Sequence, residues 1–588
     1  MAKPLDVGSG RVCASFDLAS AAWLSFGMPH PVHGFIELSA LPAFDEASRG
    51  DPGATRRHRR AMTQAEHAFL SVEVNGVAPQ LVADPSDPSR PRWRTDGVEV
   101  VAEAAPDAMV VRQSWSVLEG ADIVLCLRGS IDRPALAEIT EVNPPTPTES
   151  ATVIRIEGDT VELEAASLPA QVTIWVDGPP VAWVTSDDGL RGTITRRLDA
   201  PARFTLAVGF GADESHGSQP RAANPDALTE RALAYVRGCT ALRTADDERT
   251  ILTDHRILPL SWTRDGYWQA LALLIADGPG DRERVADHLR WLWRRCERPD
   301  GRWVRSHHAN GRRKDLAFQA DQQLYPIIEL ADYWRASGDL PGGVDWSPQV
   351  ASALDAALEE CDPTTGLIAS AENAADDPIE APFIAASQIL LWYATSRLIE
   401  IATVRGVDLD ADRLREIASA THAAFGLWIG DGPHAWPYAV DGHGARVTYQ
   451  DANDLPVALA PAWGFCDPDD LGWRATMAFA FSEANPAYCI GDRSGLGSAH
   501  TPGPWTLGDV QAWIVGRTIG DEASAADALA RLRSVAFSDS MLPEAYSVGL
   551  DADVRVRHWF AWPGAAIAAL RLLDAAGDFP GRLTAHIP

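Results

Sequence analysis

The hydrophobic pattern of this 588-residue chain changes once, near residue 212, and that change limits the folds it can adopt. Before this point, short runs rich in β-branched residues, such as Ala68–Val74 and Ala170–Val176, are separated by Gly, Pro, Asp and Asn. Runs of this length and spacing are typical of antiparallel β-sandwiches. After it, the apolar residues recur with helical periodicity. The sequence therefore predicts two architectures in series.

The helical part of the chain predicts a barrel. No sequence repeat of fixed period is found, which argues against a solenoid. Six helical hairpins closed into an (α/α)6 barrel would gather the long loops on one face, where a pocket forms. We expect the helices near residues 226–243, 264–278, 281–297, 319–337, 347–360, 382–401, 408–428, 454–463, 469–482, 505–519, 522–536 and 560–576.

We therefore predict an α+β multidomain protein in which an N-terminal antiparallel β-sandwich is followed by an (α/α)6 barrel. The sandwich is expected over residues 1–212 and the barrel over residues 226–588. Residues 213–225 contain Gly, Ser, Asn and two Pro residues and are interpreted as a linker.

The charge balance and the cysteines exclude several classes of function. With 51 basic and 81 acidic residues, the net charge of −30 opposes binding to nucleic acid or to anionic membranes. The N-terminus lacks the features of a secretory signal, and no apolar run is long enough to span a bilayer. The seven cysteines are scattered without Cys-x-x-Cys spacing, so neither a disulfide framework nor a zinc cluster is indicated. We expect a cytoplasmic protein with a neutral or cationic partner.

The first two long loops of the helical part carry candidate sugar-binding groups at helix starts. Arg264 and Asp265 are flanked by Trp262, and Asp321 begins a later helix. An acidic residue at such a position can simply cap the helix or complement its dipole. The functional alternative is that the polar groups hydrogen-bond the hydroxyls of a terminal sugar while Trp262 stacks on its ring.

The third long loop is the best place for a general acid. Glu372, Asp376, Asp377 and Glu380 fall within nine positions. Any one of them alone is more often a helix cap than a catalyst. Together, however, they repel one another, which raises one pKa and keeps a proton available.

The fourth and fifth long loops add polar and aromatic candidates. Trp436, Asp451, Asn453 and His500 lie in them, and capping is again the simpler interpretation for Asp451 and Asn453. The Gly-rich stretch 492–505 neither follows a strand nor has the spacing of a phosphate-binding loop. Because no metal-ligand spacing is found either, we expect no metal and no cofactor.

Glu544 is a single carboxylate between Pro543 and two aromatic-rich segments, just before the apolar helix expected at 560–576. A lone loop Glu is usually solvated, so by itself this residue would carry little weight. It gains weight as the last in a series of linked motifs.

These motifs, in this order and spacing, resemble those of glycoside hydrolase family 125, the metal-independent exo-α-mannosidases. The resemblance covers roughly residues 255–576. A β-sandwich ahead of the barrel is similar instead to the glucoamylase-like enzymes of families 15 and 63. The motifs are Trp262–Asp265, Asp321–Pro326, Asp441–Gly444, Gln450–Pro456, Ser482–Tyr488, Gly495–Pro502, Pro543–Tyr546 and Arg557–Trp562.

The resemblance implies an inverting mechanism with an Asp acid and a Glu base. Glu544 is then the base, and the acid is Asp377 or Asp376, with Glu372 still possible. The other motif residues would hold or wall the terminal sugar, and the departures at Gln322 and Pro543 leave a mannose-type and a glucose-type substrate open. These sugar-binding candidates are Trp262, Arg264, Asp265, Asp321, Glu372, Trp436, Asp451, Asn453, His500, Arg557 and Trp559.

We therefore predict an inverting exo-α-glycosidase that removes a terminal sugar from an oligosaccharide or small glycoside. A glycoside phosphorylase is one alternative, although it needs a basic phosphate pocket where Glu544 stands. A non-catalytic carbohydrate-binding protein on the same fold is the other. The sequence leaves the linkage, the oligomeric state and the role of the β-sandwich open.

Overall fold

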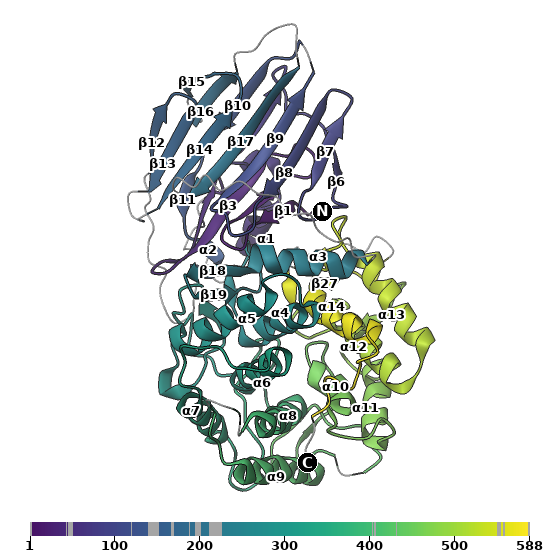
Figure 1. The fold of residues 1–588 in the computed structure, drawn as a ribbon. Coiled ribbons are helices and arrows are strands. Elements are labelled where there is room, and N and C mark those ends of the chain that lie inside the picture. Colours follow the sequence, from purple (N-terminus) through teal and green to yellow (C-terminus); the bar gives the residue numbers. More distant parts are fainter. Residues whose placement is uncertain are drawn as a thin grey trace.

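A two-layered β domain and a ring of helices make up the molecule, as the computed structural model shows (Figure 1). This confirms the predicted α+β class, a β-sandwich followed by an (α/α)6 barrel. The linker expected at 213–225 lies outside the described residues, and the domain limits at 212 and 226 stay predictions. The structure describes residues 3–585 except 43, 45–50, 119, 139–151, 166–167, 169, 187–188, 195–200, 211–225, 403, 405–406, 431, 550–553 and 557–558.

The strands of the sandwich pair antiparallel in two sheets, with the short helices α1 (Pro52–Ala61) and α2 (Ala135–Glu138) beside them. The first sheet comprises β1 (Leu5–Gly8), β2 (Cys13–Phe16), β3 (Trp23–His30), β4 (Gly34–Ser39), β5 (Leu70–Val74), β10 (Ile123–Leu127), β11 (Ser130–Asp132), β15 (Val181–Ser186) and β16 (Gly189–Ile194). The second comprises β12 (Thr152–Glu157), β13 (Thr160–Ala165), β14 (Gln171–Asp177), β17 (Ala202–Phe210), β9 (Val110–Val117), β8 (Val98–Ala104), β7 (Arg92–Thr95) and β6 (Val82–Asp84).

One buried polar side chain organises the core between the sheets. Gln113 accepts hydrogen bonds from the indole N–H groups of Trp23 and Trp115, at 2.8 and 2.9 Å, and donates to the carbonyl of Ala21 at 2.6 Å. Its amide is thereby satisfied on both sides, so burying it costs little and fixes the orientation of two large rings.

The inner helices of the barrel form a closed ring, because each packs against the next and the last packs against the first. Almost every residue of α4, α8 and α10 is buried, and most residues of α6, α12 and α14 are, as expected for helices enclosed by others. The ring consists of α4 (Thr263–Ala276), α6 (Ala320–Ser337), α8 (Ala385–Ile401), α10 (Leu455–Trp463), α12 (Thr506–Ile519) and α14 (Ala561–Ala575).

The outer helices cover this ring and leave one face in solvent. Together with the ring they match the dozen helices expected from the sequence, although Val236–Thr240 and Trp291–Arg295 continue α3 and α5 as π-helical turns. No helix in the described part of the chain combines the length and apolarity needed to cross a bilayer. The outer helices are α3 (Ala227–Tyr235), α5 (Asp281–Arg290), α7 (Trp346–Leu358), α9 (Ala411–Trp428), α11 (Leu471–Ala480) and α13 (Glu522–Val535).

Short strands connect the helices and shape the loops. They are β18 (Ala241–Ala245), β19 (Glu248–Ile251), β20 (Leu260–Ser261), β21 (His307–His308), β22 (Phe383–Ile384), β23 (Ala439–Val440), β24 (Arg446–Val447), β25 (Tyr488–Cys489), β26 (Gly495–Leu496), β27 (Ala545–Tyr546) and β28 (Val554–Val556).

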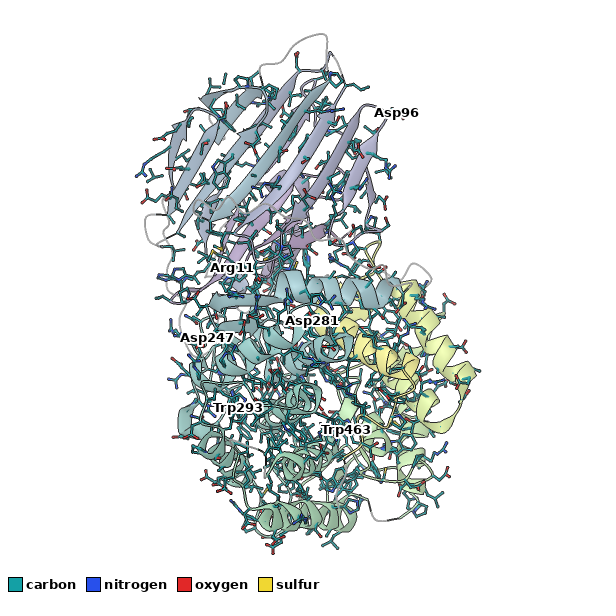
Figure 2. The ribbon with its side chains drawn as sticks, in the orientation of Figure 1. Arg11, Asp96, Asp247, Asp281, Trp293 and Trp463 are labelled. Carbon is teal, nitrogen blue, oxygen red and sulfur yellow. The ribbon has the colours of Figure 1, made fainter. Side chains whose placement is uncertain are left out.

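Tryptophan serves mainly the core of the helical domain. Trp463 stacks on Tyr393 with ring centres 4.1 Å apart, and Trp293 meets Trp303 and Trp346 edge to face. Trp293 and Trp463 both lie among the helices of the ring and its cover (Figure 2). The high tryptophan content is therefore explained mostly by packing.

A buried polar network joins the first strand to the last loops of the barrel. Asp6 accepts hydrogen bonds from Lys3 at 2.5 Å, from the indole of Trp559 at 3.0 Å and from Arg231 at 3.2 Å. Lys3 and Arg231 also pair with Asp539, at 2.8 and 2.9 Å. The carboxylates and cations thus satisfy one another where the two domains meet, and removing one partner would leave a buried charge uncompensated.

The strand β1 also approaches the barrel closely through glycine. A Cβ atom on Gly8 would lie 2.1 Å from the carbonyl oxygen of Gly238, at the end of α3. Any larger residue at Gly8 would therefore separate β1 from the barrel.

One buried carboxyl group of the barrel lacks a partner. Both side-chain oxygens of Glu329 on α6 are buried without a hydrogen bond among the described residues, and the closest His288 nitrogen is 3.8 Å away. Burial, helped by the nearby charge of Asp332, raises the pKa of Glu329 well above its ordinary value of 4.5. The group therefore folds as a neutral acid.

Replacing this acid is expected to change how stability depends on pH. The pKa of Glu329 is higher in the folded protein than in the unfolded chain, so binding of its proton stabilises the folded protein. This contribution to the free energy of unfolding is complete below pH 4.5 and is lost as the pH rises through the folded pKa. Glu329→Gln carries no such proton, so its advantage in unfolding free energy should grow by about 1.4 kcal/mol per pH unit over that range. Melting temperatures of both proteins at pH 6 and pH 8.5 measure this, and an equal gap at both pH values would contradict it.

Candidate active site

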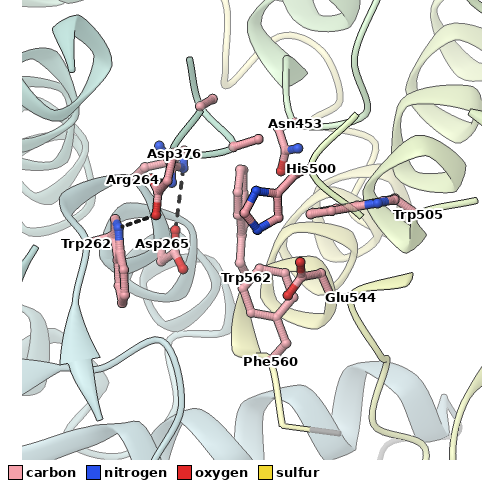
Figure 3. A pocket seen from close by; sticks show the side chains of 12 residues that line it. Trp262, Arg264, Asp265, Asp376, Asn453, His500, Trp505, Glu544, Phe560 and Trp562 are labelled. Carbon is pink, nitrogen blue, oxygen red and sulfur yellow. Dashed lines mark hydrogen bonds and ion pairs between the residues drawn. The ribbon is translucent and has the colours of Figure 1, made fainter. Parts of the chain in front are cut away.

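A pocket opens where the inner helices begin, and it holds about 320 Å³ of empty space. Trp262 precedes α4, Asn453 precedes α10, Trp505 precedes α12 and Phe560 precedes α14, so the pocket is built from helix N-termini and the loops that enter them. Figure 3 shows these side chains turned toward a common space. The lining residues are Trp262, Arg264, Asp265, Ala374, Ala375, Asp376, Asn453, His500, Trp505, Glu544, Phe560 and Trp562.

Arg264 is the fixed cation of the pocket. Its guanidinium donates to Asp321 at 2.8 Å and to the amide oxygen of Gln319 at 3.1 Å, and lies 3.7 Å from Asp376. It also lies over the ring of Trp562, 4.9 Å from its centre. Burial alone would lower the pKa of Arg264, but the neighbouring carboxylates outweigh burial and raise it. Arg264 therefore stays charged and holds the acidic loops together.

Asp376 is held rigidly in an uncommon conformation. Its φ angle of 67° lies in the left-handed region, which is costly for residues other than Gly. One carboxylate oxygen accepts from Trp262 at 3.2 Å and the other from Gln319 at 2.6 Å. Backbone strain that the surroundings enforce in this way is found most often at functional sites.

Asp377, the next residue, is oriented differently. Its carboxylate lies 3.1 Å from Nδ1 of His500, and its side chain is 36% exposed. The backbone N–H of Asp377 donates to Asn373 at 3.0 Å, which fixes the turn between the two acids. Asp376 therefore lines the pocket directly, whereas Asp377 contacts His500, which lines the pocket.

Glu544 lies on the wall formed by the last two inner helices and is only 3% exposed. Its backbone carbonyl accepts from the N–H of Thr506 at 3.1 Å, and the Thr506 hydroxyl donates to the carbonyl of Pro543 at 2.6 Å. The first turn of α12 therefore anchors the segment on which Glu544 sits. Anchoring at the backbone leaves the side chain directed into the pocket.

Asp265 lines the pocket, whereas Asp451 does not, and both carboxylates are hydrogen-bonded to neighbouring side chains. Thr253 donates to Asp265 at 2.5 Å. Asp451 accepts from Tyr449 at 2.6 Å, from Ser498 at 2.8 Å and from the side chain of Asn453 at 2.8 Å. Burial raises the pKa of Asp451. Asp451 thus links the loop of Tyr449 to the loop of Ser498, whereas Asn453 lines the pocket.

Glu372 and Asp321 border a second cavity beside the pocket. Arg305 and Gln319 both donate to Glu372, each at 3.1 Å. Burial raises the pKa of Glu372, against the opposing effect of Arg305. Of the three acids considered as proton donors from the sequence, Glu372 is the only one bound to an Arg side chain by hydrogen bonds, among the contacts described.

The structure does not bring every candidate residue to the pocket. Trp436 packs against Phe425 in the core, with ring centres 4.9 Å apart. Trp559 is fully buried and bonded to Asp6. Arg557 lies outside the described residues.

The aromatic walls come instead from residues that begin helices. Trp262, Trp505 and Phe560 each occupy the N-cap position of an inner helix, and Trp562 follows Phe560 within α14. Trp505 could have been found from the sequence, because it stands before its helix as Trp262 does. Gln319, which orients two acids, likewise occupies the N-cap position of its helix, α6.

A metal site is not visible in this arrangement. Among the described residues, no group of three or more His, Cys, Asp or Glu side chains is placed to hold a metal ion. The polar groups of the pocket contact one another and Arg264 instead.

Comparison with known proteins identifies the helical domain. The model of the metal-independent alpha-mannosidases, glycoside hydrolase family 125, matches residues 351–572. No curated protein matches the chain.

Two solved structures share the fold. A metal-independent alpha-mannosidase from Streptococcus pneumoniae, in a non-productive complex with alpha-1,6-mannobiose, is 20% identical with a TM-score of 0.51; the match covers 59% of this chain and 93% of that one. A bacterial glucoamylase complexed with acarbose is 10% identical with a TM-score of 0.62, and the match covers 99% of this chain and 97% of that one. The chain is therefore a glycoside hydrolase that matches the family 125 model over residues 351–572 and shares its two-domain fold with a bacterial glucoamylase.

Proposed function

We propose that the protein is an inverting exo-acting α-glycosidase that removes a terminal mannose- or glucose-type sugar. The observation that carries this proposal is the placement of the buried Glu544 in one pocket with Asp376 and with His500, the partner of Asp377. Two carboxyl groups flanking a scissile bond are the minimum for glycoside hydrolysis. The mannobiose and acarbose bound by the two related structures support these two sugar types.

In the proposed mechanism Glu544 acts as the general base. It takes a proton from a water molecule, which attacks the anomeric carbon from the face opposite the leaving group. Inversion needs room for that water, so the two carboxyl groups should be roughly 6.5–9.5 Å apart in the substrate complex. The anchored backbone at Glu544 would hold the base in place during the attack.

Asp377 is the preferred general acid. Both carboxylate oxygens of Asp376 accept hydrogen bonds from N–H donors, so a proton on either oxygen would face a donor. Asp377 contacts His500 and is accessible to a leaving group. Asp376 remains the alternative acid and otherwise would accept hydrogen bonds from the sugar hydroxyls, beside Arg264 and Asp265.

Exo action follows from the shape of the pocket. Helix N-termini close it on the inside, and the surrounding side chains leave only a small space between them. One terminal sugar stacked on the aromatic walls fills such a space better than a continuous chain does. Trp262 and Trp505 would supply the stacking faces.

The experiment that tests this function is a panel of aryl α-glycosides and α-linked disaccharides, with proton NMR used to identify the anomer released first. An initial β-anomer from an α-glycoside is expected. An initial α-anomer would contradict inversion. Turnover only with inorganic phosphate would indicate a phosphorylase, and binding without turnover would indicate a non-catalytic protein.

A further inference from the structure

A second cavity adjoins the pocket and shares Ala374 and Asn453 with it. It also holds about 320 Å³ of empty space, and it lies between the starts of α6, α8 and α10. Its polar wall consists of Asp321, Tyr325, Ser370, Glu372, Ser387 and Asp454.

Asp454 differs from the other acids of this cavity because its side chain is not used by the protein. It stands at the N-cap of α10 and is 3% exposed, but its carboxyl group makes no capping hydrogen bond. Its Oδ2 atom is buried and has no hydrogen-bond partner among the described residues. The first turn of α10 offers it no free donor, because Pro456 has no N–H and the N–H of Val457 donates to the backbone carbonyl of Asp454. The buried Oδ2 is therefore left for a partner outside the helix, and a ligand is one.

The other two acids of the cavity each pair with an Arg side chain. Asp321 pairs with Arg264 at 2.8 Å and Glu372 with Arg305 at 3.1 Å. Each of these acids therefore already has a cationic partner, which it shares with another carboxylate, Asp376 or Asp315. Of the three acids in this cavity, Asp454 is therefore the one available to bind a ligand.

The groups around Asp454 decide its protonation state. Asp451 on the same loop, Asp321 on α6 and Arg264 on α4 all act on it, and the phenols of Tyr325 and Tyr438 are close enough to sense its charge. Burial, reinforced by Asp451 and Asp321 and opposed by Arg264, raises the pKa of Asp454 well above its ordinary value. Burial thus favours the protonated form, which offers an O–H donor together with a carbonyl acceptor.

We propose that Asp454 is a substrate-binding residue that hydrogen-bonds one hydroxyl group of the terminal sugar, which reaches into the second cavity between Ala374 and Asn453. The ligand class is a neutral sugar with a hydroxyl at that position, rather than an amino sugar or an anionic one. This inference rests on the proposed function, because it concerns the same sugar. It makes Asp454 a determinant of specificity separate from the acid and the base.

The test measures binding without turnover. In a Glu544→Gln background, calorimetry gives the dissociation constants of methyl α-mannopyranoside and methyl α-glucopyranoside and of their monodeoxy derivatives. Adding Asp454→Leu should weaken the preferred sugar about tenfold. For one monodeoxy derivative the added substitution should have no further effect, because the hydroxyl partner is already gone.

A pH series separates a binding role from a structural one. With Asp454 intact, affinity should fall as the pH rises through its pKa, whereas Asp454→Asn, which keeps a donor and an acceptor, should bind within a few-fold at neutral pH and lose that fall. Glu329→Gln is the matched control, since Glu329 is also a buried acid without a partner but lies away from both cavities. It should change neither affinity nor pH dependence.

Several results would overturn the proposal. They are an equal loss with Asp454→Leu for every derivative, an unchanged pH profile with Asp454→Asn, tighter binding of an amino sugar, or no binding of either methyl glycoside. Failure of the proposed function would show itself differently, as normal turnover in Glu544→Gln or as no hydrolysis of any glycoside by the unmodified protein.

Discussion

Glu544→Gln is expected to lose about 10²–10⁴-fold in turnover number, the usual contribution of a general base. The amide cannot accept a proton from water, but it has nearly the same size and keeps a hydrogen-bonding group in the pocket wall. The backbone bonds to Thr506 are untouched, so the segment should stay in place. The turnover number on the best aryl α-glycoside and the affinity for the matching methyl glycoside measure the two effects separately.

Glu483→Gln serves as the control, because Glu483 is exposed and does not line the pocket. It should retain full turnover. Normal turnover by Glu544→Gln would remove Glu544 from the mechanism. A parallel loss of turnover and sugar affinity would instead make Glu544 a binding residue.

The second large effect separates Asp377 from Asp376 as the proton donor. Asp377→Asn should lose about 10²–10⁴-fold on disaccharides, whose leaving group must be protonated. On α-glycosyl fluorides or dinitrophenyl α-glycosides, whose leaving groups depart without a proton, its turnover should stay close to that of the unmodified enzyme. The ratio of turnover on the two substrate classes is the measurement.

Asp376→Asn should behave differently, since its carboxylate is bonded to Trp262 and Gln319 and faces Arg264. It should lose activity on both substrate classes alike, with a higher KM. If the two variants exchange these behaviours, Asp376 is the acid. If neither depends on the leaving group, Glu372→Gln becomes the variant to test.

The fold could be predicted from the sequence because its signals are local. Helical periodicity reports burial along one segment, and the structure has helices in all twelve regions expected. The errors lie at segment ends: the expected helices at 226–243 and 281–297 stop earlier as α-helices and pass into π-helical turns. A hydrophobic pattern cannot distinguish a change of helix type from continuation.

The candidate site was harder to predict, because contacts across the chain decide it. Trp559 lies three residues before Trp562, and nothing in that stretch says which ring faces the pocket. The hydrogen bond from the indole of Trp559 to Asp6, 553 residues away in the sequence, places Trp559 in the interface between the domains instead of the pocket. Asp454 was not among the predicted site residues; only the structure shows that it stands at the N-cap of α10 without a capping bond from its side chain.

The network around Asp6 also has a consequence for how the enzyme is made. Asp539 and Trp559 bracket the segment that carries Glu544, and both are held by residues at the beginning of the chain or at the start of the barrel. During synthesis the first strand emerges long before these partners do, so the contacts that hold the Glu544 segment form late. A helical domain expressed alone would lack Lys3 and Asp6, leaving Arg231 and Asp539 to pair without them. The first strand of the sandwich thus helps to hold the segment that carries Glu544.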